Sequence, residues 1–111
     1  MTFKLFYTDY SKDKHVRSDE AVTETLENIT ELMQSLLQEE DNFIGIIDDD
    51  NVMLQFMVDE DGSLIVDLPM HDQKGSFTRK ADLNECITIV NSLQGKIDKD
   101  QIEGLEFKSW G

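Results

Sequence analysis

Three short runs of β-forming residues, joined by two short acidic connections, constrain the fold of this chain more than any other feature. The runs span residues 43–47, 52–58 and 64–68, and the connections are Asp48–Asn51 and Asp59–Gly62. Connections of this length join consecutive antiparallel strands. The segment therefore predicts a three-stranded meander whose two turns lie at opposite ends of a sheet.

The middle run indicates which face of the meander is buried. Side chains on one face are Val52, Leu54, Phe56 and Val58, and those on the other are Met53, Gln55 and Met57. Successive side chains of a strand point to opposite faces, so we expect the first set in the core and the second on a freer face. The methionines there, and Met70 after the third run, either pack the sheet or form an adaptable contact surface.

An amphipathic helix is expected before the meander. Apolar residues recur at spacings of four and three from Val22 to Leu36, which is the stripe of a helix running from Asp19 to about Gln38. Ser18 is placed to cap its first turn. The outer face of this helix carries three acids, which are Glu24, Glu27 and Glu31.

A second helix is expected after the meander. Asp82 and Glu85 have the spacing of a capping box, with Asp in place of Ser or Thr at the N-cap. We expect the apolar stripe of this helix to face the core, and its residues are Leu83, Cys86, Ile87, Val90 and Leu93. Gly95 is placed to terminate this helix.

The remaining segments complete the predicted topology. In order they are an opening strand with Phe3, Leu5 and Tyr7, a polar connection Thr8–Arg17, a loop Pro69–Ser76, a short strand Phe77–Lys80 and a closing strand Leu105–Trp110. The element order is then β-α-β-β-β-(β)-α-β, which predicts an α+β fold with one mostly antiparallel sheet and two helices packed on it. At 111 residues we expect a single domain, residues 1–111.

The charge of the chain is strongly negative and unevenly distributed. The formal net charge is −14, and between Ser18 and Gln73 there are sixteen acids and no Lys or Arg. Such a field repels nucleic acid and anionic membranes and attracts cationic surfaces. Two interpretations are open: the acidity keeps the protein soluble, or it forms a surface that binds a basic protein.

No pattern in the sequence predicts catalysis, a metal or a cofactor. The acidic runs lack the alternate ligand spacing and distal Glu of a calcium loop, and the two histidines, His15 and His71, fall in predicted loops. Cys86 lies on the inward stripe of the second helix, where a thiol packs as a small apolar group. We therefore expect a protein that is not an enzyme.

A cytoplasmic location is expected. The single cysteine suits a reducing compartment, and the first residues lack the apolar region and cleavage site of a signal peptide. The apolar runs are also far shorter than the roughly 18 residues that a membrane-spanning helix needs.

The pattern from about Asp19 to Trp110 resembles the small α+β immunity proteins of bacterial polymorphic-toxin and contact-dependent inhibition systems. The resemblance rests on an early helix, the meander, a second helix and a late tryptophan. The residues that carry it are Val52–Phe56, Gly62–Asp67, Leu83–Ile87 and Trp110. It implies neutralisation of a cognate toxin by tight binding, often over the active site or substrate-binding surface of that toxin.

A toxin that acts on nucleic acid must be basic where it meets phosphate, and the acidity of this chain would complement it. The candidate partner-binding residues are Glu24, Glu27, Glu31, Asp48, Asp49, Asp50, Asp59, Glu60 and Asp61. The alternative is a phage-type nucleic-acid mimic that inhibits a defence protein. A mimic would place its acids along a continuous stripe, like a phosphate backbone.

Overall fold

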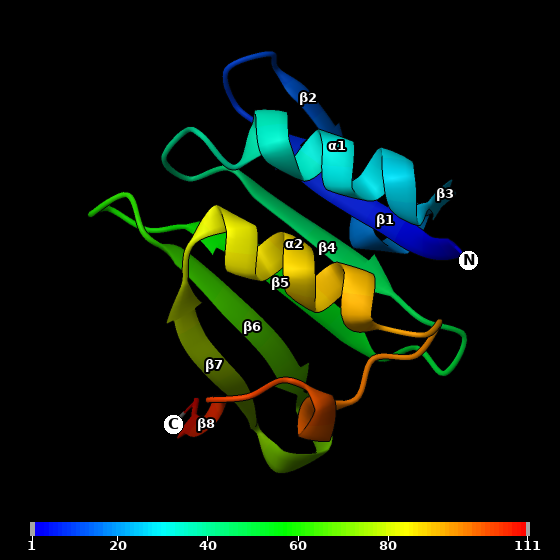
Figure 1. Ribbon diagram of the computed structural model, residues 1–111, viewed down its shortest axis with the longest axis vertical. Coiled ribbons are helices and arrows are strands. Elements are labelled where there is room, and N and C mark those ends of the chain that lie inside the picture. Colours follow the sequence, from blue (N-terminus) through cyan, green and yellow to red (C-terminus); the bar gives the residue numbers. More distant parts are fainter. Residues whose placement is uncertain (1, 111) are drawn as a thin grey trace.

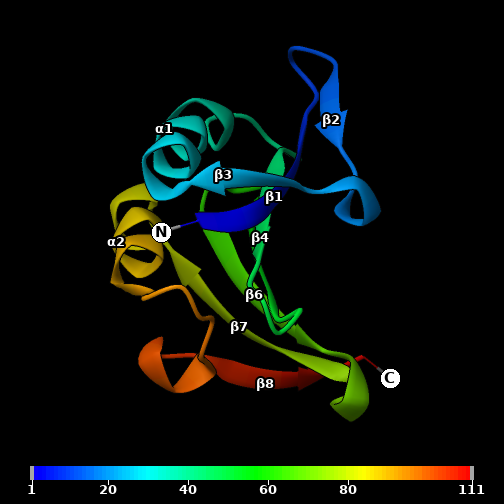
Figure 2. The ribbon, with the colours of Figure 1, turned by 90° about the vertical axis from the view of Figure 1, so that its right-hand side faces the viewer.

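The computed structural model describes residues 2–110, which form one eight-stranded sheet with two α-helices (Figure 1). Figure 2 shows that both helices lie on the same side of the sheet. The strands are β1 (Thr2–Asp9), β2 (Lys14–Val16), β3 (Val22–Thr25), β4 (Phe43–Ile47), β5 (Met53–Val58), β6 (Leu64–Met70), β7 (Gly75–Ala81) and β8 (Glu106–Ser109). The helices are α1 (Leu26–Leu36) and α2 (Leu83–Ser92), and the short 3-10 helices are η1 (Ser18–Glu20), η2 (His71–Gln73) and η3 (Lys99–Gln101).

The strand order across the sheet is β2-β1-β4-β5-β6-β7-β8, and β3 also pairs with β1. Every pairing is antiparallel. The predicted α+β class, with one mostly antiparallel sheet and two helices on it, is therefore confirmed. No helix within residues 2–110 is long and apolar enough to cross a membrane.

The meander forms as predicted, with β4, β5 and β6 as neighbours. Its two turns project from opposite ends of the sheet (Figure 1). Leu54, Phe56 and Val58 are buried toward the helices, whereas Met53, Gln55 and Met57 are half-buried on the other face. The core fills the space between the sheet and the helices, which contribute Ile29, Met33, Leu36, Cys86 and Val90.

The capping box of α2 is confirmed. The Glu85 backbone N–H donates to Asp82 Oδ1 at 2.8 Å, and the Asp82 N–H donates to Glu85 Oε1 at 3.3 Å. Together these bonds satisfy donors that the first helical turn would otherwise leave free. The helix ends at Ser92, before Gly95, so the prediction that Gly95 terminates it is wrong.

The prediction of one helix from Asp19 to Gln38 is partly wrong. Ser18 begins η1, residues 22–25 form β3, and α1 begins only at Leu26, with the Thr25 hydroxyl accepting from the Asn28 N–H at 3.2 Å. Val22 fits the helical spacing by coincidence. It lies opposite Leu5 of β1 instead, because pairing with a distant strand overrides the local pattern in a stretch rich in β-branched residues.

Two expected loops are also shorter than predicted. Residues 14–16 form β2 inside the expected connection Thr8–Arg17, and β6 continues through Pro69 to Met70. The Asp59 N–H donates to the Ser63 carbonyl, so the backbone hydrogen-bonding groups of odd-numbered residues in β6 point toward β5. Pairing between β5 and β6 ends before Pro69, so the proline nitrogen, which cannot donate, removes no hydrogen bond between these strands.

Candidate functional site

Six carboxylates gather at one end of the sheet. The Val58 N–H donates to the Asn42 carbonyl at 3.1 Å and Phe43 pairs with Met57, so the α1–β4 loop lies beside the β5–β6 turn. Both segments project from the same end of the sheet in Figure 1. We call this cluster the acidic end; it consists of Glu39, Glu40, Asp41, Asp59, Glu60 and Asp61.

One base, Lys80, contacts the acidic end. Its Nζ lies 3.1 Å from Asp61 Oδ2 and 3.8 Å from Asp59 Oδ2. Hydrogen bonds from the Ser63 hydroxyl and backbone N–H, and then the contact with Lys80, hold the pKa of Asp61 well below its usual range. Within residues 2–110, no Lys, Arg or His side chain lies within ion-pair distance of Glu39, Glu40, Asp41 or Glu60.

An apolar row borders the acidic end on the sheet face that the helices leave open. Phe43, Met57 and Ile65 lie side by side on adjacent strands, and each is half-buried. Phe43 begins β4 directly after the α1–β4 loop, and Met57 lies two residues before the β5–β6 turn. The exposed acids therefore form a rim along one side of this row.

Polar side chains cross the middle of the same face. Gln55 Nε2 lies 3.4 Å from Asp67 Oδ2, and Asp67 also accepts a hydrogen bond from Ser76. The Trp110 indole Nε1–H donates to the Ser76 hydroxyl at 2.9 Å, so the chain of contacts extends toward β8. Burial raises the pKa of Asp67, and the Ser76 bond offsets part of that rise.

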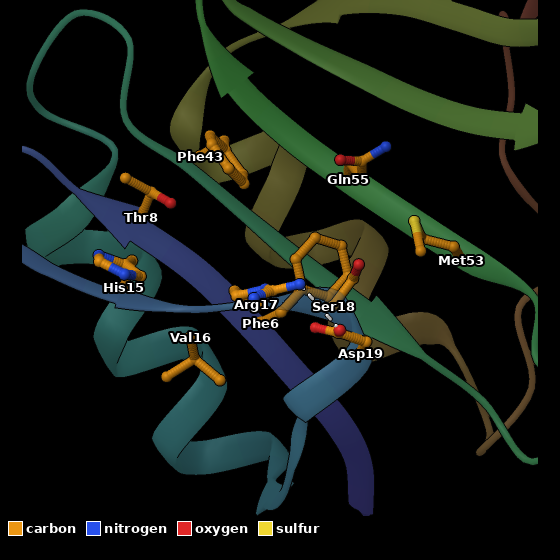
Figure 3. A pocket seen from close by; sticks show the side chains of 10 residues that line it. All are labelled: Phe6, Thr8, His15, Val16, Arg17, Ser18, Asp19, Phe43, Met53 and Gln55. Carbon is orange, nitrogen blue, oxygen red and sulfur yellow. Dashed lines mark hydrogen bonds and ion pairs between the residues drawn. The ribbon is translucent and has the colours of Figure 1, made fainter.

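A cleft of about 570 Å³ lies on the open face near β2 (Figure 3). Tyr7 pairs with Val16 and Leu5 pairs with Val22, so residues 17–21 form a wide bulge opposite Phe6 alone. The bulge and its neighbours form the polar wall of the cleft. This wall includes Arg17, whose guanidinium contacts Asp19 at 3.0 Å. The apolar lining consists of Phe6, Val16, Phe43 and Met53.

The candidate residues named from the sequence fall into separate places. Asp59, Glu60 and Asp61 lie in the acidic end, and Glu27 and Glu31 are exposed on α1. Glu24 lies on β3 instead of a helix, where its Oε1 accepts from Asn28 Nδ2 at 2.7 Å. Asp49 and Asp50 are exposed in the β4–β5 turn at the opposite end, with Asp50 3.4 Å from Lys96.

Asp48 is removed from the set of candidate contacts. It is 5% exposed, and its carboxylate accepts the backbone N–H groups of Asp50, Val52 and Ile97. Its neighbours in the same acidic run remain at the surface. The residue therefore holds the turn and a distant loop together, and a partner cannot reach it.

Sequence reasoning missed Glu39, Glu40 and Asp41. The predicted pairing of β4 with β5 could have indicated them, since antiparallel neighbours bring the start of one strand beside the end of the other.

No group of three or more His, Cys, Asp or Glu side chains within residues 2–110 is placed to hold a metal ion. Comparisons of the chain with protein-family models, curated proteins and solved structures found no significant match.

Proposed function

We propose that this protein binds a basic protein partner through the acidic end and the apolar row Phe43, Met57 and Ile65, and that it neutralises this partner as an immunity protein neutralises a toxin. The observation that carries the proposal is the adjacency of the two features. Four of the six carboxylates are free of ion pairs within residues 2–110, and they border half-buried apolar side chains that no helix covers.

The arrangement has the composition that protein interfaces favour. Interfaces combine an apolar centre with a polar, solvent-accessible rim. Complementary charge steers diffusing partners into register and accelerates association, and apolar contacts slow dissociation. In this division of roles, the acidic end sets the association rate and the apolar row sets the lifetime of the complex.

The immunity role is preferred over the nucleic-acid mimic because of how the acids are distributed. The acidic end consists of two adjacent loops at one end of the sheet. A mimic would instead need carboxylates spaced along the molecule at intervals similar to those of phosphates. The resemblance of the sequence to immunity proteins, and the match between a strongly acidic chain and a nucleic-acid-targeting toxin, support the same choice.

Charge reversal at the two ends of the sheet tests the proposal. The tagged chain first captures the partner from the native host. The partner is then expressed and purified, and the rate at which it associates with the chain is measured as a function of ionic strength. Glu39→Lys with Glu40→Lys should slow association about tenfold at low salt and flatten its salt dependence. The matched control, Asp49→Lys with Asp50→Lys, changes the net charge equally at the opposite end and should have a small effect.

A third variant tests the apolar row. Met57→Ala should speed dissociation with little change in the association rate, because it removes contact area without removing charge. All variants are also compared for protection of cells that express the partner. No effect of either charge reversal would show that the acidity serves solubility alone. Equal effects would show that the net charge steers the partner instead of the acidic end, and either outcome would overturn the proposal.

A further inference from the structure

The two edges of the sheet are built differently. At one edge, β2 and β3 pair with successive parts of β1 and are separated by the bulge of residues 17–21. A bulge of this kind interrupts the edge and discourages further strands from pairing there. At the other edge, β8 is an uninterrupted strand and the last in the sheet order (Figure 2).

The backbone of β8 presents hydrogen-bonding groups at this edge. The Trp110 N–H donates to the Lys74 carbonyl at 2.9 Å, in the same register that pairs Phe107 with Phe77. Along an antiparallel strand, the backbone N–H and C=O groups of successive residues point alternately to one side and the other. Those of Glu106 and Lys108 therefore point toward β7. The N–H and C=O of Phe107 then point outward, where no strand lies among residues 2–110.

Large apolar side chains accompany this edge. Phe107 is 43% exposed and Trp110 is 52% exposed, and they are two of the four large apolar residues that the described chain leaves exposed. The Phe107 ring packs edge-on against Phe77, with 5.3 Å between ring centroids. An exposed edge strand beside exposed aromatic rings is a site for strand addition.

The side-chain pattern of β8 is complementary to itself. In a continuous sheet, two copies of β8 can pair antiparallel about a twofold axis at Glu106, Phe107 or Lys108. An axis at Glu106 or Lys108 places like charges directly opposite each other, which is unfavourable. An axis at Phe107 places Glu106 opposite Lys108 of the second copy, twice, and lets the two outward-facing Phe107 residues exchange backbone hydrogen bonds.

We propose that β8 is a homodimer interface, in which two copies of this chain pair antiparallel about Phe107 and join their sheets into one. The charge of the region favours a second copy over a basic partner. Residues 74–111 contain six acids and six bases, whereas the negative excess lies between Ser18 and Gln73. Pairing at β8 leaves the acidic end, which lies around β4 and β5, outside the interface.

Analytical ultracentrifugation of the full chain over a range of concentrations tests the proposal. The wild-type chain should form a dimer. Glu106→Lys and Lys108→Glu, each alone, should weaken dimerisation at least about tenfold, because both cross-strand pairs of the dimer become repulsive. The double variant Glu106→Lys with Lys108→Glu restores opposite charges across the axis, so it should dimerise as the wild type does.

An equimolar mixture of the two single variants provides the sharpest result. A copy with two carboxylates on β8 faces a copy with two ammonium groups, so the mixture should form a heterodimer although neither variant dimerises well alone. Circular dichroism and thermal melting check that the exposed substitutions leave the fold intact. A monomeric wild type, or a dimer that neither single variant weakens, contradicts the proposal. Neither outcome bears on the acidic end, since these substitutions leave it unchanged.

Discussion

The backbone N–H of Ile97 donates a hydrogen bond of 2.9 Å to the carboxylate of Asp48, although the two residues lie 49 positions apart in the chain. The other carboxylate oxygen accepts the N–H groups of Asp50 and Val52, each at 2.9 Å. A single buried side chain therefore closes the β4–β5 turn and ties it to the segment that follows α2. This bond also explains why the first acid of the Asp48–Asp50 run differs in role from the other two.

Replacement of Asp48 should destabilise the fold. Asp48→Ala leaves three backbone donors without their carboxylate partner, so we expect the free energy of unfolding to fall by about 3 kcal/mol. Asp49→Ala, the matched loss of one carboxylate from the same turn, should change it by less than about 0.5 kcal/mol. Urea denaturation compares the two variants, and equal midpoints would contradict the role assigned to Asp48.

Gly45 should not tolerate a side chain while Phe6 is present. A Cβ at Gly45 would overlap the Phe6 ring, which packs across this glycine from the neighbouring strand. Gly45→Ala should therefore cost about 1–3 kcal/mol of stability, as overpacking does. In a Phe6→Leu background the same substitution should cost less, and a double-mutant cycle of thermal or urea unfolding measures this coupling. Strictly additive losses would show that the ring does not set the constraint.

Cys86 should react slowly with thiol reagents in the native protein. The side chain is fully buried on α2, and burial, followed by the nearby charges of Asp82 and Glu85, raises the pKa of its thiol to about 12. The thiolate is the reactive form, so both its low population and its lack of access slow alkylation. Mass spectrometry at mildly alkaline pH should show little labelling of the folded chain and rapid labelling in denaturant. Similar rates in the two states would contradict the observed burial.

Asp67 should lower stability at neutral pH. Burial raises its folded-state pKa above the unfolded value, so the folded state binds the proton more tightly. Stability then falls as the pH rises from the unfolded pKa, about 3.9, through the folded pKa. Asp67→Asn should raise the melting temperature at neutral pH, and this gain should shrink as the pH falls below about 4. Melting temperatures across pH measure the effect.

An exposed carboxylate provides the control for Asp67. Asp49→Asn removes the same charge from a solvent-exposed turn at the end of the sheet opposite the acidic end. It should leave the melting temperature and its pH dependence close to those of the wild type. If both Asn variants shift the pH profile of the melting temperature in the same way, the smaller net charge explains the gain in stability. Removal of a half-buried carboxylate at Asp67 would then not be its cause.

The sequence alone determined the elements whose signals are local. The meander, the inward placement of Cys86 and the capping box of Asp82 and Glu85 all follow from spacings within a few residues, and the structure confirms each of them. Alternation, capping and short turns act between near neighbours, so a linear pattern contains all the information that they need.

Only the tertiary structure decided the features that depend on pairing between distant segments. Val22 has the spacing of a helix, yet it pairs with Leu5, and pairing of β4 with β5 brings Asp41 beside Asp59. The proposed site and the β8 edge both depend on such registers. A register is fixed by the combined burial and hydrogen bonding of strands far apart in the chain, so no local window of the sequence specifies it.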